Sequence, residues 1–264
     1  MSSAKDIEVH PISKQAADAV VKRFHYSGKV DPRSQLHFGV FYRGSCYGAM
    51  QFGPSIDKAK TIRLVRDTPW NGFLELNRLA FGEMLPKNSE SRALGYVFRL
   101  MKKKYPHLKW VVSFADATQC GDGAIYRACG FVLTQIKENR SMWRMPGGEV
   151  VCQLSLTIGR STTLRRRYGM QPTETFGRFA KRVGAECLPG YQLRYLKFLD
   201  DSYRSRLSVP VIPFSEIAAR GVGMYRGFRR DGVSISTGAD QASGDGVTPI
   251  SLLQSISPPE QSQP

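Results

Sequence analysis

Long apolar runs are missing from this sequence. No stretch of about 18 consecutive apolar residues occurs, so we expect no membrane-spanning helix. The N-terminal residues MSSAKDIEV lack the apolar core of a secretory signal peptide. Internal repeats are also absent. Together these absences predict a protein that does not associate with a membrane.

Cysteine is scarce, and its spacing excludes the common metal and redox motifs. The chain has five cysteines, an odd number, and none forms a CxxC pair: Cys46, Cys120, Cys129, Cys152 and Cys187. An odd count without regular spacing does not suggest a disulfide framework. We therefore expect reduced thiols in a cytosolic compartment.

Acidic residues are few relative to basic ones. The 264 residues include 38 Lys and Arg against 22 Asp and Glu, a net charge of +16 and a sequence pI near 9.9. Such an excess does not define a fold, but it favours a polyanionic partner. With 41% hydrophobic residues, the chain can form one domain with additions or two small domains.

The stretch Trp110–Phe131 predicts a strand, a polar turn and a short helix. Trp110–Ala115 is an apolar run of strand length, Asp116 begins the turn, and Tyr126 lies on the helix expected near 123–129. Ligands of open α/β sheets bind beyond the carboxyl ends of strands, so this turn is a candidate site. The alternative is an ordinary strand–turn–helix corner with a capping aspartate.

A second candidate is the strand expected at Phe73–Phe81. Strand alternation would place Glu75 and Arg78 on opposite faces, unless a bulge redirects one of them. A buried charge is costly unless it is paired, so Arg78 or Glu75 is expected to serve a site. The alternative is a structural ion pair between them.

Two helix ends carry further candidates. Ser13 is expected to cap a helix that ends at Phe24, and His25 and Tyr26 follow at its exit. His25 could transfer protons or merely complement the helix dipole. A later helix, capped by Asn88 or Ser89, would offer its free N–H groups to an anion, with three polar residues nearby: Ser89, Ser91 and Arg92.

Other segments give simpler expectations. Gln35–Arg43 and Cys46–Gly53 read as a hairpin, Gln153–Ile158 as a strand, and Tyr191–Phe198 as a further strand. Trp70 could be exposed for stacking, but packing is the favoured expectation.

A basic insertion is expected at about 155–190. Mixed arginines and aromatic residues there suit a phosphate backbone, although a solvated basic face is the alternative. The candidate DNA-binding residues are Arg160, Arg165, Arg166, Arg167, Arg178, Lys181 and Arg182. We expect one domain over 1–237, and the Ser/Gly/Pro-rich tail at 238–264 should be disordered.

The order of these elements resembles the GNAT acyltransferase fold. This resemblance implies an α/β protein with a mixed central sheet flanked by helices, a basic insertion and a disordered C-terminal tail. Phe73–Phe81 would lie along the arm of acetyl-CoA or another acyl donor, and Tyr126 would protonate the leaving thiolate. The usual glycine-containing phosphate loop is absent, because Pro86–Ser91 stands in its place.

Longer motifs carry a narrower resemblance. The segments HYSGKV, FLELNRLAF, SFADATQCGDGAIYRACGF and YQLRYLKFLD are similar to the Mom family of phage DNA-modification proteins. That resemblance implies a carbamoylmethyl-type modification of adenine N6 in double-stranded phage DNA, which protects it from restriction enzymes in the host cytoplasm. The family's proposed site would correspond to His25, Tyr26, Arg78, Ser91, Asp116 and Tyr126. The family has also been linked to iron, for which His25 and Asp116 are the candidate ligands.

The chemistry assigns a role to each of these groups except Ser91. Asp116 or His25 would accept the N6 proton, and Arg78 would orient the amino group or neutralise the developing charge. Tyr126 would protonate the leaving group, and Tyr26 would position the base. The adenine would have to leave the duplex to reach them. Two other functions stay open: acylation of a protein or small amine from acetyl-CoA, and DNA binding without catalysis.

Overall fold

The computed structural model describes residues 3–117, 123–157, 162–222, 224–225 and 228–229. The expected tail at 238–264, Arg160 and most of the turn after Asp116 lie outside the described residues. None of the described helices combines the length and apolarity that a membrane span requires.

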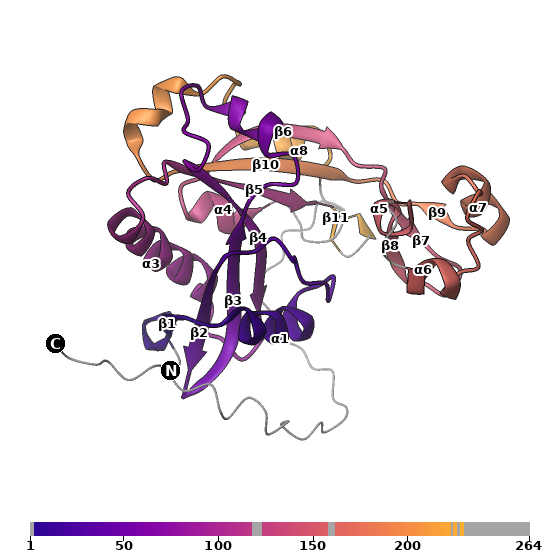
Figure 1. Cartoon of the computed structure of the whole chain (residues 1–264), viewed down its shortest axis with the longest axis horizontal. Coiled ribbons are helices and arrows are strands. Elements are labelled where there is room, and N and C mark those ends of the chain that lie inside the picture. Colours follow the sequence, from indigo (N-terminus) through magenta and orange to yellow (C-terminus); the bar gives the residue numbers. More distant parts are fainter. Residues whose placement is uncertain (1–2, 118–122, 158–161, 223, 226–227, 230–264) are drawn as a thin grey trace.

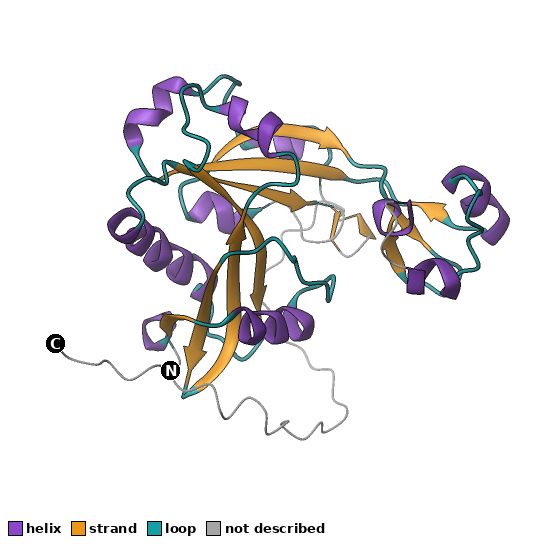
Figure 2. Cartoon of the chain, in the orientation of Figure 1, coloured by secondary structure: helices purple, strands orange, loops and turns teal. Residues whose placement is uncertain are grey.

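A seven-stranded mixed sheet forms the centre of the protein (Figures 1 and 2). Strands β4 and β5 run parallel, and the other neighbouring strands run antiparallel. The expected mixed central sheet is thereby confirmed. In spatial order its strands are β1 (Glu8–Pro11), β2 (Leu36–Tyr42), β3 (Ser45–Gly53), β4 (Phe73–Phe81), β5 (Trp110–Asp116), β10 (Tyr191–Phe198) and β6 (Val132–Glu138).

Helices cover both faces of this sheet, as expected (Figure 1). Helix α1 (Lys14–Phe24), whose first turn is capped by Ser13, packs with Ala49 and Ala80 on one face. Helix α3 (Ser89–Lys104) packs its apolar stripe against the other face. The shorter elements are η1 (Ala4–Asp6), α2 (Lys58–Thr61), η2 (Ile62–Leu64), α4 (Ala124–Ala128), η3 (Asp201–Arg206), α8 (Ser215–Ala219), β11 (Met224–Tyr225) and β12 (Phe228–Arg229).

The sheet opens between its two parallel strands. β4 and β5 pair only from Phe73–Glu75 to Trp110–Val112, although β4 continues to Phe81 and β5 to Asp116. The strands therefore part at their carboxyl ends, where ligands of α/β sheets bind. A ligand-binding site is therefore expected at this opening.

A β-bulge interrupts β4 at Asn77. Gln51 of β3 pairs with Arg78, whereas the next residue, Phe52, pairs with Leu76, so Asn77 is the extra residue. Leu76 and Leu79 both pack in the core beneath α3. The three-residue step between them reverses the alternation of the strand.

The chain between β6 and β10 forms a separate lobe beyond one end of these two strands (Figure 1). It leaves at Glu138 and returns at Tyr191, which pair with each other, and the expected basic insertion lies inside it. A three-stranded sheet and three helices surround a small core of their own that includes Met145, Leu156 and Phe179. The elements are β7 (Met142–Arg144), β8 (Val150–Cys152), α5 (Gln153–Thr157), α6 (Thr162–Arg167), α7 (Phe176–Val183) and β9 (Glu186–Cys187).

Two local expectations are wrong. Gln153–Thr157 is helical because Cys152 already pairs with Met142, the first residue of β7, which leaves no partner strand for the residues that follow. Trp70 is 58% exposed and is covered by the ammonium group of Lys58, 4.7 Å from its ring centroid, instead of packing into the core.

Candidate functional site

Glu75 is half-buried at the point where β4 and β5 part. It is the last residue of β4 that pairs with β5, and its Oε2 accepts a hydrogen bond of 2.5 Å from the Ser55 hydroxyl. Burial raises the pKa of the Glu75 carboxyl, while the Ser55 hydrogen bond and the charge of Arg33 act in the opposite direction. A carboxyl with a raised pKa beside an opening is suited to accept a proton.

An ion pair lies next to this carboxyl. Asp31, only 4% exposed, accepts hydrogen bonds from Arg33 Nε at 3.0 Å and from Arg33 Nη2 at 2.5 Å. Although burial raises the pKa of Asp31, the Arg33 hydrogen bonds lower it below its usual value. Asp31 therefore stays ionised, so the charge of Arg33 is largely neutralised and Glu75 remains the carboxyl that is poised to titrate.

Arg78 faces the same side of the sheet as Glu75. Its Nε donates to the carbonyl oxygen of Lys29 at 2.7 Å, and its Nη1 donates to the carbonyl oxygen of Asn77 at 2.6 Å. Among the described residues, Arg78 forms no ion pair with Glu75, so the alternative of a structural pair is not what the strand contains. Both of these acceptors are neutral carbonyl groups.

His25 lies within electrostatic reach of Arg78. Burial, with a contribution from the positive charge of Arg78, lowers the pKa of His25 to about 4. Its Nδ1 lies 2.8 Å from the Ser27 hydroxyl and accepts a hydrogen bond of 3.2 Å from the backbone N–H of Ser27. With Nδ1 as acceptor, the hydrogen of the neutral ring lies on Nε2. The adjacent Tyr26 is 56% exposed, with its ring centroid 4.3 Å from that of His25.

Asp116 and Tyr126 belong to opposite faces of the sheet. Asp116 ends β5 in alternation with Val112 and Phe114, which places it on the face of Glu75. Tyr126, on α4, packs against the other face, where its hydroxyl accepts a 3.0 Å hydrogen bond from Ser113. Its ring stacks on Tyr195 at 4.9 Å. Asp116 thus lies on the face of Glu75, and Tyr126 lies on the opposite face.

The predicted anion-binding residues differ in availability. Ser89 is fully buried and donates its hydroxyl to the Pro86 carbonyl oxygen at 2.6 Å. Ser91 donates to Asn88, whose backbone is left-handed, at 3.2 Å, and Arg92 is exposed. A surface hollow of about 380 Å³ at this end of α3 is lined by residues that include Ser91, Arg92 and Arg99.

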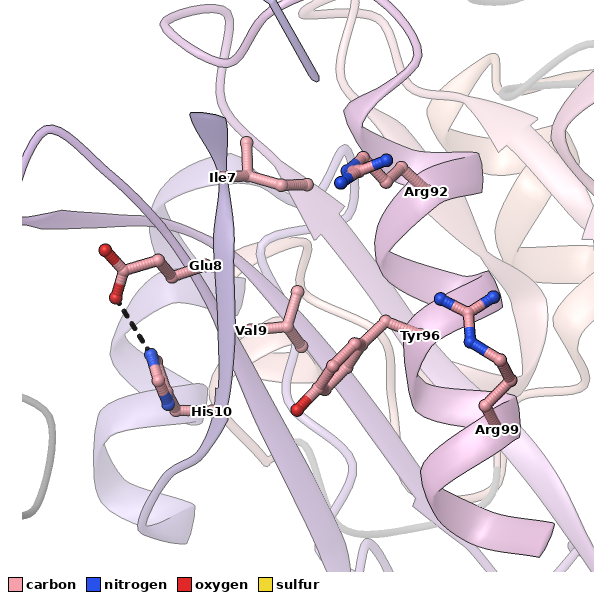
Figure 3. A pocket seen from close by; sticks show the side chains of 7 residues that line it. All are labelled: Ile7, Glu8, Val9, His10, Arg92, Tyr96 and Arg99. Carbon is pink, nitrogen blue, oxygen red and sulfur yellow. Dashed lines mark hydrogen bonds and ion pairs between the residues drawn. The ribbon is translucent and has the colours of Figure 1, made fainter. Parts of the chain in front are cut away.

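A second hollow of about 300 Å³ lies between β1 and α3 (Figure 3). Arg92, Tyr96 and Arg99 form its helical side, while His10 and Glu8, 3.0 Å apart, lie across from them on β1. Apart from Arg92, it contains none of the predicted site residues.

The predicted DNA-binding residues of the insertion fall into two groups. Arg167 pairs with Glu149, Arg182 pairs with Glu174, and Arg165 donates to backbone carbonyl groups. The other described members are exposed and form no hydrogen bond or ion pair with the described residues: Arg166, Arg178 and Lys181.

No group of three or more His, Cys, Asp or Glu side chains in the described part of the chain could hold a metal ion. His25 also fits poorly as a ligand, because Nδ1 accepts a backbone N–H and Nε2 carries the hydrogen. The described residues do not support the iron implied by the family resemblance.

The sequence pattern indicated Glu75 only as an alternative to Arg78 and did not point to Ser55, Asn77 or Arg33. An acid in the middle of the apolar strand FLELNRLAF was the available signal for Glu75. Ser55 and Arg33 lie in loops whose approach to β4 depends on tertiary structure, so no local pattern identified them.

Solved structures similar to this chain include two acetyltransferases. The ribosomal-protein-S18-alanine N-acetyltransferase from Escherichia coli is 10% identical, with a TM-score of 0.41 over 74% of this chain and 94% of that one. The IAA acetyltransferase from Bacillus cereus ATCC 14579 is 12% identical, with a TM-score of 0.41 over 73% of this chain and 99% of that one. Scores this low do not support the transfer of a site or a ligand.

The sequence comparisons are more specific. A model described as the Mom protein family matches residues 6–216. The methylcarbamoylase Mom of Escherichia phage Mu is 31% identical over 206 residues, an overlap of 78% of this chain and 80% of the phage protein. Since the family model and this relative both cover most of the chain, the protein belongs to the Mom family.

Proposed function

We propose that the protein is a transferase that modifies the N6 amino group of adenine in phage DNA. The added group is of the carbamoylmethyl type and protects the DNA from host restriction enzymes. Membership of the Mom family and the name of the phage Mu relative, a methylcarbamoylase, support this proposal. The observation that carries it is the half-buried, hydrogen-bonded Glu75, with its raised pKa, at the opening between β4 and β5.

The chemistry of adenine N6 explains why such a carboxyl is needed. Its lone pair is delocalised into the ring, so the amino group must be oriented and must lose a proton as the new bond forms. A carboxylate whose pKa is raised by burial is a stronger base than an exposed one. We assign proton acceptance to Glu75, with Asp116 on the same face as the second candidate.

His25 has a different role in this proposal. With Nδ1 accepting from Ser27 and a pKa near 4, the ring is neutral and presents an N–H at Nε2. Such a ring donates a hydrogen bond instead of accepting the N6 proton. His25 therefore orients the base through its Nε2 hydrogen, Tyr26 offers an exposed ring for stacking, and Arg78 stabilises negative charge.

Tyr126 approaches from the other face of the sheet. A proton donor for the leaving group must lie across the reacting carbon from the base that serves the nucleophile, and α4 is across the sheet from Glu75. In the balanced step, N6 forms a bond to a methylene carbon and its proton passes to Glu75. The leaving atom takes the bonding electrons and the Tyr126 proton. Plain acyl transfer would instead give an N-acyl adenine.

The donor is a phosphate-bearing molecule whose transferred methylene carbon carries the leaving group, since acetyl-CoA itself would give an N-acetyl adenine. Arg92 and Arg99 form no ion pair with the described residues and line the hollow at the start of α3 together with Ser91. Those side chains would hold the anionic end of the donor, whose carbon would be transferred in the opening. Ser89 does not belong to this group, because its buried hydroxyl is bonded to Pro86.

The target adenine must leave the duplex, because N6 cannot reach a carboxyl within the sheet from inside the base stack. Extrusion costs about a few kcal/mol, which contacts to the DNA must offset. Mass spectrometry of nucleosides from cells that express the chain tests the proposal. An adenine nucleoside heavier by a carbamoylmethyl group is expected. Unaltered adenine together with an acylated protein or amine would favour a plain acyltransferase, and DNA binding without any product would favour a non-catalytic protein.

A further inference from the structure

The segment 139–190 between β6 and β10, which we call the excursion, contains more basic than acidic side chains. Residues 139–190 contain nine Lys and Arg side chains against three glutamates, a local net charge of +6. The three glutamates pair with Arg144, Arg167 and Arg182. Each of these arginines is therefore occupied within the excursion.

The cations that remain are presented to solvent. Arg178 and Lys181 lie three residues apart on α7, and Phe176, Phe179 and Ala180 on the same helix are buried in the small core. Burial of that apolar face fixes the orientation of the helix, so the two cations share its exposed side. Arg166 of α6 is the third exposed cation without a partner among the described residues.

Two connections place this excursion beside the opening between β4 and β5. The carbonyl oxygen of Lys29 accepts from Arg78 at 2.7 Å, while the Lys29 ammonium group donates to Ser155 of α5 at 3.2 Å. The backbone also joins them, because Ala117, which follows Asp116, donates to the carbonyl oxygen of Tyr191 at 2.8 Å. A ligand that bridges the excursion and the opening would therefore span adjacent parts of the molecule.

We infer that the excursion 139–190 is a phosphate-backbone clamp for double-stranded DNA, in which Arg166, Arg178 and Lys181 contact phosphates and the paired arginines maintain the fold. This inference rests on the proposed function for its choice of polyanion. Unpaired, exposed cations gain most from phosphate contact, since they break no internal pair when they bind. Such contacts position a duplex without reading its sequence.

Binding to a fluorescent duplex over a range of salt concentrations tests the inference. Three neutralised phosphates contribute a log–log slope of about −2.7, at roughly −0.9 each. The variant Arg166→Ala, Arg178→Ala, Lys181→Ala should flatten the slope by about that amount on every sequence tested. Equal binding by a single strand or by an acidic protein would contradict a duplex clamp.

A matched control separates position from total charge. Replacing Lys102, Lys103 and Lys104, in the last turn of α3, by alanine also removes three positive charges. This control should leave the slope unchanged, and equal flattening in both variants would overturn the inference. The variant Arg166→Lys, Arg178→Lys keeps the charges and should keep the slope, so a loss there would also overturn it.

Nucleoside mass spectrometry distinguishes failure of this inference from failure of the proposed function. The triple alanine variant should modify adenine less than wild type at moderate salt, and this deficit should shrink at low salt, because the variant weakens DNA binding without removing a proton-transfer group. A wild-type protein that modifies adenine while the triple variant keeps the full slope would overturn the clamp alone. A slope change as expected, without any altered nucleoside in the wild type, would support the clamp and refute the proposed function.

Discussion

Glu75 and Arg78 lie on the same face of β4, although regular alternation would put them on opposite faces. The bulge at Asn77 shifts the register by one residue between them. As a result Glu75 reaches Ser55 and Arg78 reaches the carbonyl oxygen of Lys29 on the side of the sheet covered by α1. The bulge therefore supplies a base and a cation to one side of the opening.

Ser55→Ala should move the pH dependence of modification to higher pH. The Ser55 hydrogen bond lowers the pKa of Glu75, so its loss raises that pKa further above the ordinary value. The ascending limb of the pH–rate profile should shift upward, with activity recovering at alkaline pH. Ser205→Ala, which removes an exposed hydroxyl on η3, is the control. An unshifted limb would show that Glu75 is not the titrating base.

His25→Gln should reduce the acid sensitivity of the fold. The folded protein holds His25 at a pKa of about 4 against 6.5 when unfolded, so the unfolded chain binds the extra proton between these values. Stability is therefore lost as pH falls through that window, by about 2 kcal/mol between pH 7 and 5. Urea unfolding at both pH values should show this loss in wild type but not in His25→Gln. His107→Gln, at an exposed site, should behave as wild type.

Gly53→Ala should disturb the site through packing. A Cβ there would lie 2.5 Å from the Arg33 carbonyl oxygen and 2.7 Å from Asn77 Oδ1, contacts that force the loop or the bulge to move. We expect a loss of about 1–3 kcal/mol in unfolding free energy and reduced modification.

Gly95→Ala on α3 is the matched control for that substitution. Its new Cβ would meet only the flexible end of Arg99, at 3.7 Å, and alanine is favoured in a helix interior by about 0.5–1 kcal/mol. Equal destabilisation of the two variants would contradict the packing argument.

Most of the architecture follows from local sequence. The bounds of β4 and β10 and the cap of α1 match the sequence expectations, because alternation, capping serine and turn glycines determine them locally. The strand expected from Gln153 was wrong because a short apolar run becomes a strand only where a partner strand reaches it, and none reaches Gln153–Thr157. The expectation that Trp70 packs into the core was wrong because no local pattern shows whether an aromatic residue in a loop reaches the core.

The candidate site was less accessible to sequence reasoning. His25, Arg78, Asp116 and Tyr126 were found as polar residues at element ends, and their arrangement around one opening stays a prediction. The importance of Glu75 depends on a bulge, on Ser55 and on Arg33, and all three are tertiary features. The division of the insertion arginines into paired and unpaired groups likewise required the positions of Glu149 and Glu174.

The central claim is that Glu75 accepts the N6 proton during modification of adenine. The most direct measurement is the mass of the adenine nucleosides in DNA from cells that express wild type, Glu75→Gln or the exposed control Glu83→Gln. Wild type and Glu83→Gln should yield the carbamoylmethyl adduct, while Glu75→Gln should lower its rate of formation by about 10²–10⁴-fold at equal protein level. Undiminished adduct in Glu75→Gln, or unmodified adenine with the wild type, would contradict the account.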